Sequence, residues 1–160
     1  MFKQLNQISV QYIKHIHKKI NNTKFLIKDK NFLSNNIIPI NNDDKIFLII
    51  TGKLVRMRGE YISINLDNIV DINKLKDIDD HNIQFINSLG ADYTYKTFLF
   101  DKSNLLSLHV QKNTQYCDEH GKHFVLRERN DIKVFFEYKN IFINKNVCSN
   151  ILVVKRIELL

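Results

Sequence analysis

The feature that most restricts the fold of this chain is a long β-forming segment with a tight turn near its end. It reads IFLIITGKLVRMR over 46–58, then Gly59-Glu60, then YISINL over 61–66. β-branched and aromatic residues favour strands, and glycine at the first of two central turn positions suits a type II′ turn. The segment therefore predicts an antiparallel hairpin. Gly52, inside the first strand, predicts a bulge or sharp bend of the kind that turns the corner of a barrel.

Short apolar runs separated by Asn, Asp and Gly continue through the rest of the chain. Strands at intervals of about 8 to 12 residues are typical of small barrels and sandwiches. We therefore expect a mainly β fold, either a small OB-like barrel or a β-sandwich of antiparallel hairpins. The further strands predicted are 93–100 paired with 105–111, 123–129 paired with 132–138 across Asn130-Asp131, and 141–144 followed by 151–157.

Two helices are predicted beside these strands. An internal helix begins at Asp79 or Asp80 and ends at Gly90, a residue that commonly terminates helices. The N-terminal residues predict an amphipathic helix over 1–22, ahead of a single β-rich domain over 23–160. Such a helix packs on the sheet, binds a protein partner or lies on a membrane surface. Its apolar stripe is Phe2, Leu5, Ile8, Tyr12, Ile13, Ile16 and Ile20.

The charge of the chain is basic, with 24 Lys and Arg against 17 Asp and Glu among 160 residues and a net charge of +7. Its 20 Asn and 23 Ile, with a single Ala, are typical of a very AT-rich coding sequence, so part of the Lys content reflects mutational bias. The longest strictly apolar run is 46–50, whereas a membrane span needs about 20 residues. Two cysteines make no disulfide framework. We expect a cytoplasmic protein that does not enter membranes.

The hairpin around Gly59-Glu60 places arginines beside an aromatic ring. Arginine is the informative cation here, because lysine is the default in an AT-rich sequence, and its planar group binds phosphate and stacks on rings. The alternative is that these polar side chains only make the exposed face soluble and bind no ligand. The pairs expected on the solvent face are Arg58 with Tyr61, Arg56 with Ser63 and Leu54 with Asn65; those on the core face are Met57 with Ile62 and Val55 with Ile64.

Two other predicted hairpins carry similar side chains. Arg127 and Arg129 share a face with aromatic residues of 132–138, and Lys96 and Phe98 share a face with His109. Arginine and aromatic side chains together are what single-stranded nucleic acid binding requires, since the cations hold the backbone and the rings stack on bases. Phe98 fits a buried sheet face as well as a stacking surface.

No motif for catalysis or for a cofactor is present. Cys117, His120 and His123, with Cys148 as a distant fourth residue, have ligand chemistry for zinc, but the chain has no Cys-x-x-Cys pair and a Gly-containing turn explains the segment as well. There is no G-x-G-x-x-G and no G-x-x-x-x-G-K-[ST] sequence. We expect no cofactor, no metal and no enzymatic activity.

The Gly-broken strand followed by EYISINL resembles the early strands of an OB-fold, the architecture of many single-stranded DNA-binding proteins. The resemblance covers about 20 of the 160 residues, near 46–66. It implies a five-stranded, partly open barrel that binds single strands across one sheet face, often with a helix between the third and fourth strands.

The hypothesis from the sequence is a non-enzymatic binder of single-stranded DNA or RNA. Its composition would suit an accessory protein in the replication of an AT-rich viral or plasmid genome. The alternative is a structural or interaction β-sandwich, such as a virion or assembly component, whose basic charge is incidental. The predicted contacts are Arg56, Arg58, Tyr61, Lys96, Phe98, Arg127 and Arg129.

Overall fold

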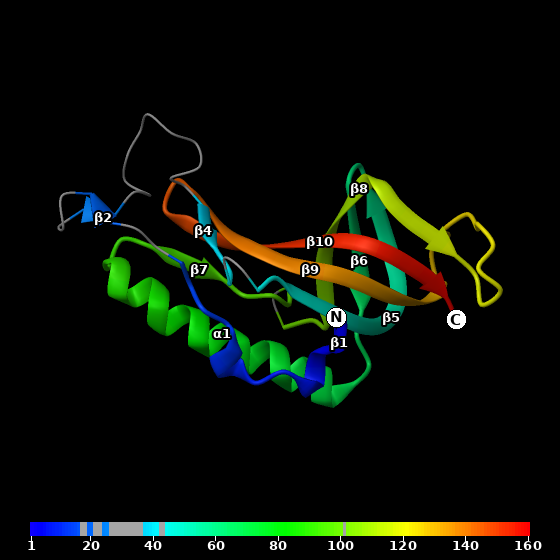
Figure 1. The fold of residues 1–160 in the computed structure, drawn as a ribbon, viewed down its shortest axis with the longest axis horizontal. Helices are drawn as coiled ribbons and strands as arrows, with labels where there is room; N and C mark the ends of the chain where they lie inside the picture. Colours follow the sequence, from blue (N-terminus) through cyan, green and yellow to red (C-terminus); the bar gives the residue numbers. More distant parts are fainter. Residues whose placement is uncertain (17–18, 21–23, 26–36, 42–43, 101) are drawn as a thin grey trace.

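The computed structural model describes residues 1–16, 19–20, 24–25, 37–41, 44–100 and 102–160, which form a mainly β structure with one α-helix (Figure 1). The expectation of a mainly β fold with an internal helix is confirmed. Within these ranges, no helix has the length and apolar character needed to cross a membrane. The elements are β1 (Lys3–Gln4), β2 (Lys19–Ile20), β3 (Lys24–Phe25), β4 (Ile37–Pro39), β5 (Ile46–Arg58), β6 (Tyr61–Asn65), α1 (Ile69–Leu89), β7 (Thr94–Lys96), β8 (Leu105–Cys117), β9 (Asp131–Asn144) and β10 (Val147–Leu159).

Five of the strands pair in a ring. β5 pairs with β6, β6 with β8, β8 with β10, β10 with β9, and β9 again with β5. The pair of β8 with β10 is parallel and the other four pairs are antiparallel. In Figure 1 these strands lie at the end of the molecule that carries the C-terminus. We call this part the ring region.

β9 and β10 continue past the ring as a long hairpin. Its far half is flanked by β4, which pairs with β9 at residues 140–142, and by β7, which pairs with β10 at residues 147–149. α1 runs beneath this part of the sheet (Figure 1). We call β4, β7, α1 and the far half of the hairpin the helix-covered region. The buried apolar side chains of both regions form one continuous cluster.

Gly52 lies where β5 changes its neighbour. Residues 46–53 pair with β9 and residues 53–58 pair with β6. A Cβ atom on Gly52 would lie 2.8 Å from the backbone oxygen of Asn65, so the close approach of β6 requires glycine. The predicted bulge lies three residues further on, where the register shifts between Leu54 and Arg56.

The predicted hairpin is confirmed, with two corrections. Met57 pairs with Ile62 as predicted, but it is 45% exposed and does not belong to the core. Arg58 pairs with Tyr61 and Arg56 with Ser63, and Gly59 has a φ of 58°. The bulge, however, places Leu54 opposite Ile64, so Leu54 is buried and Val55 is exposed. The predicted partners of Leu54 and Val55 were wrong because the pairs were counted back from the turn. One extra residue in the strand moves the side chains beyond it, counted from the turn, to the opposite face.

α1 begins at Ile69, ten or eleven residues before the predicted start at Asp79 or Asp80. Asn68 caps it, since its Oδ1 accepts the backbone N–H groups of Val70 and Asp71. Asp79 lies inside the helix and is buried. Gly90 follows the last helical residue, as predicted. The inward stripe of the helix includes Ile72, Leu75, Ile78, Asn82, Ile86 and Leu89.

The predicted N-terminal α-helix is not formed. Residues 5–7 and 10–12 are two 3₁₀ turns, and β1 pairs with β5 at Leu48 and Ile49. The i, i+3 spacing that predicted a helix is also the period of a 3₁₀ turn, and Leu5, Ile8 and Ile13 are still buried. Residues 17–18 and 21–22 of the predicted helix lie outside the described residues.

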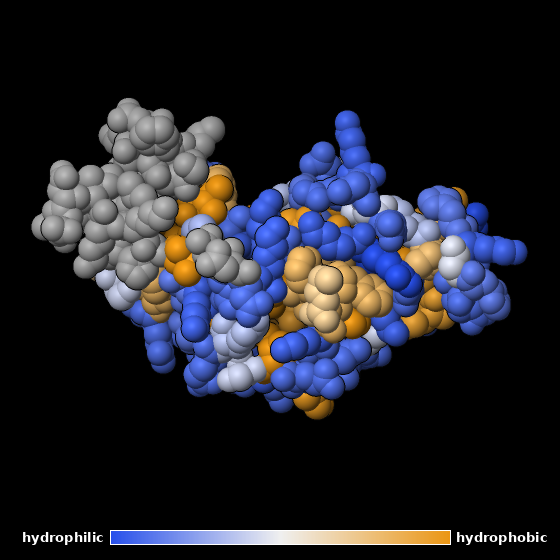
Figure 2. All heavy atoms as spheres, in the orientation of Figure 1, coloured by the Kyte–Doolittle hydropathy of each residue, from blue (hydrophilic) through white to orange (hydrophobic). Residues whose placement is uncertain are grey.

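The N-terminus packs on the outer side of the sheet instead. The ring of Phe2 lies edge-on to Phe47 and Phe135, with centroid distances of 5.1 and 5.3 Å. Figure 2 shows an apolar patch near the middle of this face of the molecule, over β5 and β9. β-sheet pairing and this aromatic contact stabilise an extended N-terminus in place of a helix.

The two other predicted hairpins were wrong in their partners. β7 pairs with β10, and of the predicted strand 93–100 it is Leu99, outside β7, that forms a bridge to Leu106 of β8. Residues 118–130 form a loop, so the predicted strand 123–129 is absent. The hairpin that forms joins β9 to β10 through Lys145 and Asn146, both with positive φ. The pairing was mispredicted because strands that are consecutive in the sequence were assumed to lie side by side in the sheet.

Candidate nucleic-acid interface

Two rows of side chains cross the outer face of β5, β6 and β8. Paired residues on adjacent strands point to the same side of a sheet, so each row is continuous. Arg56 and Arg58 are exposed, and Tyr61 is 51% exposed. The structure therefore brings together the first three predicted contacts. The first row is Arg58, Tyr61 and His109, and the second is Arg56, Ser63 and Ser107.

His109 extends the aromatic surface of the first row. Its ring centroid lies 5.1 Å from that of Tyr61, and its Nε2 lies 3.0 Å from Oε2 of Glu60. A carboxylate only accepts, so this nitrogen donates. This bond holds the Glu60 carboxylate beside the two rows, where its negative charge opposes the positive charge of Arg56 and Arg58.

A pocket of about 340 Å³ opens beside these rows, between β6, β7, β8 and β10. The pairing of β10 with β7 ends at Ser149 and its pairing with β8 begins at Val153, so residues 150–152 have no strand partner on this edge. The side chains around the pocket include one lysine and no carboxylate. Its lining is Tyr61, Lys96, Thr97, Phe98, Leu106, Ser107, His109, Phe142, Ser149, Asn150, Ile151 and Leu152.

Lys96 and Phe98 of the predicted set both line this pocket. Lys96, on β7, is exposed. Phe98 is only 8% exposed, and its ring packs edge-on against Tyr138 at a centroid distance of 5.5 Å. Phe98 therefore belongs to the core beneath the pocket and does not present an open ring face to solvent.

Arg127 and Arg129 lie elsewhere. The backbone N–H of Arg129 donates to the oxygen of Leu54, and the N–H of Leu54 donates to Asn130. These bonds place residues 129–130 along the edge of β5 opposite β6. Arg127 lies in the adjacent turn, where its N–H donates to Oδ1 of Asn130. Both arginines are exposed, but they do not belong to the two rows.

Sequence reasoning missed a buried polar network in the helix-covered region. Asn82 on α1 is wholly buried, and its Nδ2 lies 2.9 Å from the hydroxyls of both Tyr95 and Tyr138. Nδ2 of Asn150 donates to Tyr95 at 2.7 Å, and Tyr138 donates to Oδ1 of Asn150. These residues lie on four elements, α1, β7, β9 and β10. The one signal in the sequence is Asn82, a polar residue within the apolar stripe of α1.

Burial shifts the pKa values of Tyr95, Tyr138 and the neighbouring Asp79. Burial raises the pKa of Asp79 to about 6, although Tyr95 and the backbone N–H of Phe98 donate to its Oδ1. Burial likewise raises the pKa of Tyr95 and of Tyr138. Both tyrosines stay neutral, and each acts as donor and acceptor between α1 and the sheet.

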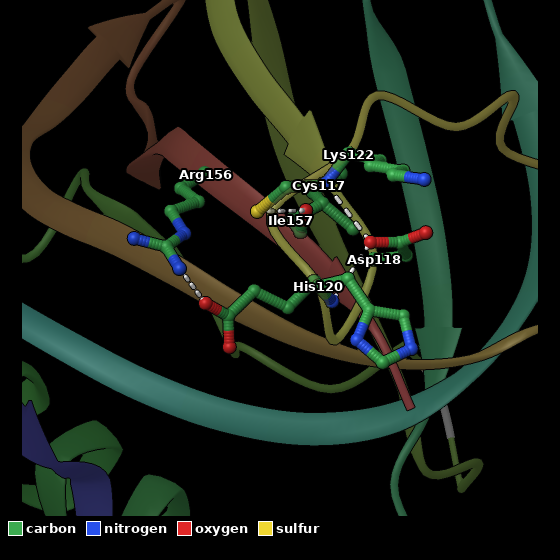
Figure 3. Close-up of polar contacts among 7 residues, drawn as sticks. Cys117, Asp118, His120, Lys122, Arg156 and Ile157 are labelled. Carbon is green, nitrogen blue, oxygen red and sulfur yellow. Dashed lines mark hydrogen bonds and ion pairs between the residues drawn. The ribbon is translucent and has the colours of Figure 1, made fainter.

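The residues considered for zinc are held apart. Cys148 pairs with Ile143, whereas Cys117 pairs with Glu158, ten residues further along β10 and so roughly 30 Å away. Figure 3 shows Cys117 beside Ile157, whose oxygen lies 3.9 Å from its sulfur. Among the described residues, no three His, Cys, Asp or Glu side chains are placed to share a metal ion.

The turn that follows Cys117 is organised by Asp118 (Figure 3). Its Oδ1 accepts the backbone N–H groups of His120 and Lys122 at 2.8 and 2.9 Å. The bond from Lys122, followed by that from His120, holds the pKa of Asp118 below its usual range. This is the Gly-containing turn that the sequence offered as the alternative to a metal site.

Comparison of the chain with protein-family models, with curated proteins and with solved structures found no match.

Proposed function

We propose that this protein is a non-enzymatic binder of single-stranded nucleic acid, built on a small OB-like barrel. The ring of β5, β6, β8, β10 and β9, with its parallel pair of β8 and β10, supports this reading. In OB-folds the second and third strands carry the binding face, and β6 and β8 hold these positions in chain order. α1 departs from the pattern of that family, because it lies between the second and third strands of the ring.

The observation that carries the proposal is the row of Arg58, Tyr61 and His109 across β5, β6 and β8. Guanidinium groups bind backbone phosphates, and an exposed ring stacks on any base at about 1–3 kcal/mol. Arg56 adds a second cation on the same face. Stacking and charge recognise no particular base, so we expect binding that depends weakly on sequence.

Fluorescence anisotropy with a labelled single-stranded oligonucleotide tests the proposal. The variant R56A/R58A/Y61A removes two cations and one exposed ring from the face, and we expect it to bind at least tenfold more weakly. If about three phosphates are neutralised, wild-type affinity falls about 20-fold between 50 and 200 mM salt.

The matched control is K76A/K122A/F100A, which removes the same charge and one ring from α1, the 118–130 loop and the turn after β7. These three side chains are exposed, and this variant should bind like the wild type. Equal weakening of both variants, or no binding by folded wild-type protein at low salt, contradicts the proposal.

One observation favours the alternative, a protein whose surface serves assembly. Val125 is 71% exposed and Met57 is 45% exposed, and both line an apolar pocket of about 270 Å³ between the hairpin and the 118–130 loop. Light scattering during size-exclusion chromatography separates the two functions: a concentration-dependent oligomer that V125D dissociates, without oligonucleotide binding, favours assembly.

A further inference from the structure

The pocket beside the two rows has an open strand edge as one wall. Residues 150–152 of β10 lie between the end of β7 pairing and the start of β8 pairing. Successive residues of a strand direct their N–H and C=O groups to alternate edges. At least one of these three residues therefore offers both groups to the pocket, and a heterocyclic base has the donors and acceptors to match them.

Two aromatic rings stand at the rim of this pocket. Tyr61 comes from β6 and Phe142 from β9, and in the strand order β6, β8, β10, β9 the unpaired edge lies between them. Phe142 is 39% exposed, so part of its ring is accessible to a ligand in the pocket. A flat ligand entering the pocket would meet a ring on each side.

The size and charge of the pocket restrict what it can hold. Its volume, about 340 Å³, is at the lower end of the roughly 300–1,000 Å³ typical of small-molecule sites. It suits a group the size of one nucleoside. Lys96 is the single Lys or Arg among the lining residues, and within the described residues it forms no ion pair. Its ammonium group is available to a phosphate.

The remaining polar groups do not select one base. The hydroxyls of Ser107 and Ser149 line the pocket, and each can both donate and accept. Asn150 has its side chain engaged by Tyr95 and Tyr138. The pocket therefore has the chemistry to accept any base edge, in agreement with the stacking surface beside it.

We propose that this pocket receives one unstacked nucleobase of a single strand lying across β6 and β8, held between Tyr61 and Phe142, with Lys96 at the adjoining phosphate. The inference rests on the proposed function and adds to it a defined site for one base. It predicts that part of the affinity depends on the presence of a base and on the ring of Phe142, separately from the phosphate contacts of Arg56 and Arg58.

The test compares two labelled probes of about ten residues: an oligothymidylate, and a strand of the same length in which every residue is abasic. Anisotropy is measured for wild type, F142A and the control F100A, whose ring is 65% exposed outside the pocket. We expect the wild type to bind the abasic strand at least tenfold more weakly. In F142A this preference should fall to about threefold, and F100A should keep the wild-type preference.

Each outcome has one meaning. A preference that F142A leaves unchanged, or that F100A reduces equally, overturns the base pocket while the proposed function stands. Failure of folded wild type to bind either strand overturns the proposed function itself. If F142A does not fold, F142L keeps an apolar side chain without a flat ring, and it should show the same reduced preference.

Discussion

The ring region and the helix-covered region share the β9–β10 hairpin but place their polar side chains in opposite ways. In the ring region, Arg56, Arg58 and Tyr61 lie outside, exposed on the sheet surface. In the helix-covered region, Asn82 and Tyr138 lie inside, hydrogen-bonded between α1 and the sheet. The buried side chains of the ring region include Leu48, Ile50, Val134 and Phe136, whereas α1 places the polar Asn82 between the helix and the sheet.

Because of this difference, substitutions in the two regions should affect different properties of the protein. Exposed charges contribute little to folding and remain available to a ligand. Buried polar groups are costly when unpaired, so a satisfied network specifies how α1 sits on the sheet. Changes in the helix-covered region should therefore affect the free energy of unfolding, and changes on the outer face of the ring region should affect affinity.

The largest expected effect is that of N82A. It removes the Nδ2 donor that α1 supplies to the hydroxyls of Tyr138 and Tyr95, although Tyr95 keeps its bond to Asp79. We expect the free energy of unfolding to fall by about 3 kcal/mol. Urea unfolding measures this. N87A removes an exposed Asn from the same helix and should change stability by less than about 0.5 kcal/mol. Equal losses in the two variants would mean that the network does not hold α1.

A pH dependence comes next, from Asp79. Its pKa is raised to about 6 by burial, above the unfolded value, so the folded state binds more protons between about pH 4 and 6. Stability from this group is therefore present at low pH and is lost as pH rises through 6. Between pH 4.5 and 7.5 the wild type should lose about 2 kcal/mol more than D79N, which keeps an Oδ1 acceptor. Urea unfolding at both pH values measures this. If the free energy of unfolding changes by the same amount in wild type and in D79N, the prediction is wrong.

G52A should destabilise the ring region. The added Cβ would lie 2.8 Å from the backbone oxygen of Asn65, so β6 must shift, at about 2 kcal/mol. G59A serves as the control, because nothing lies within 4 Å there and only its φ of 58° is unfavourable, at about 1 kcal/mol. Thermal unfolding of both variants decides whether the ring tolerates a side chain where β5 changes partner.

The smallest effect should be a gain in affinity. E60Q removes the carboxylate that lies 3.0 Å from Nε2 of His109 beside the two rows, and we expect oligonucleotide binding to tighten about threefold at low salt. E119Q removes a similar carboxylate, 3.3 Å from His120 in the 118–130 loop, and should leave affinity unchanged. A loss of affinity in E60Q would show that His109 needs its partner to present the ring.

Much of the candidate interface was predictable because it is local. The turn at Gly59-Glu60 and the period of two along each strand suffice to put Arg58 opposite Tyr61. The bulge beside Leu54 was not predictable in position, since no residue there is special. The pocket was not predictable either, because its walls come from strands that are distant in sequence. In the sequence, Phe142 does not differ from the other apolar residues of a strand.

The local structure follows from the amino-acid sequence: the β5–β6 hairpin, the end of α1 at Gly90 and the outward position of Arg56 and Arg58. Backbone preferences and the alternation of side chains act over a few residues, so the sequence is enough to predict them. Tertiary contacts determine that β7 joins β10, that β1 pairs with β5 and that Asn82 is buried. These features depend on which segments, distant in the sequence, bury each other's apolar side chains. Several different strand pairings are compatible with the same alternation of polar and apolar residues.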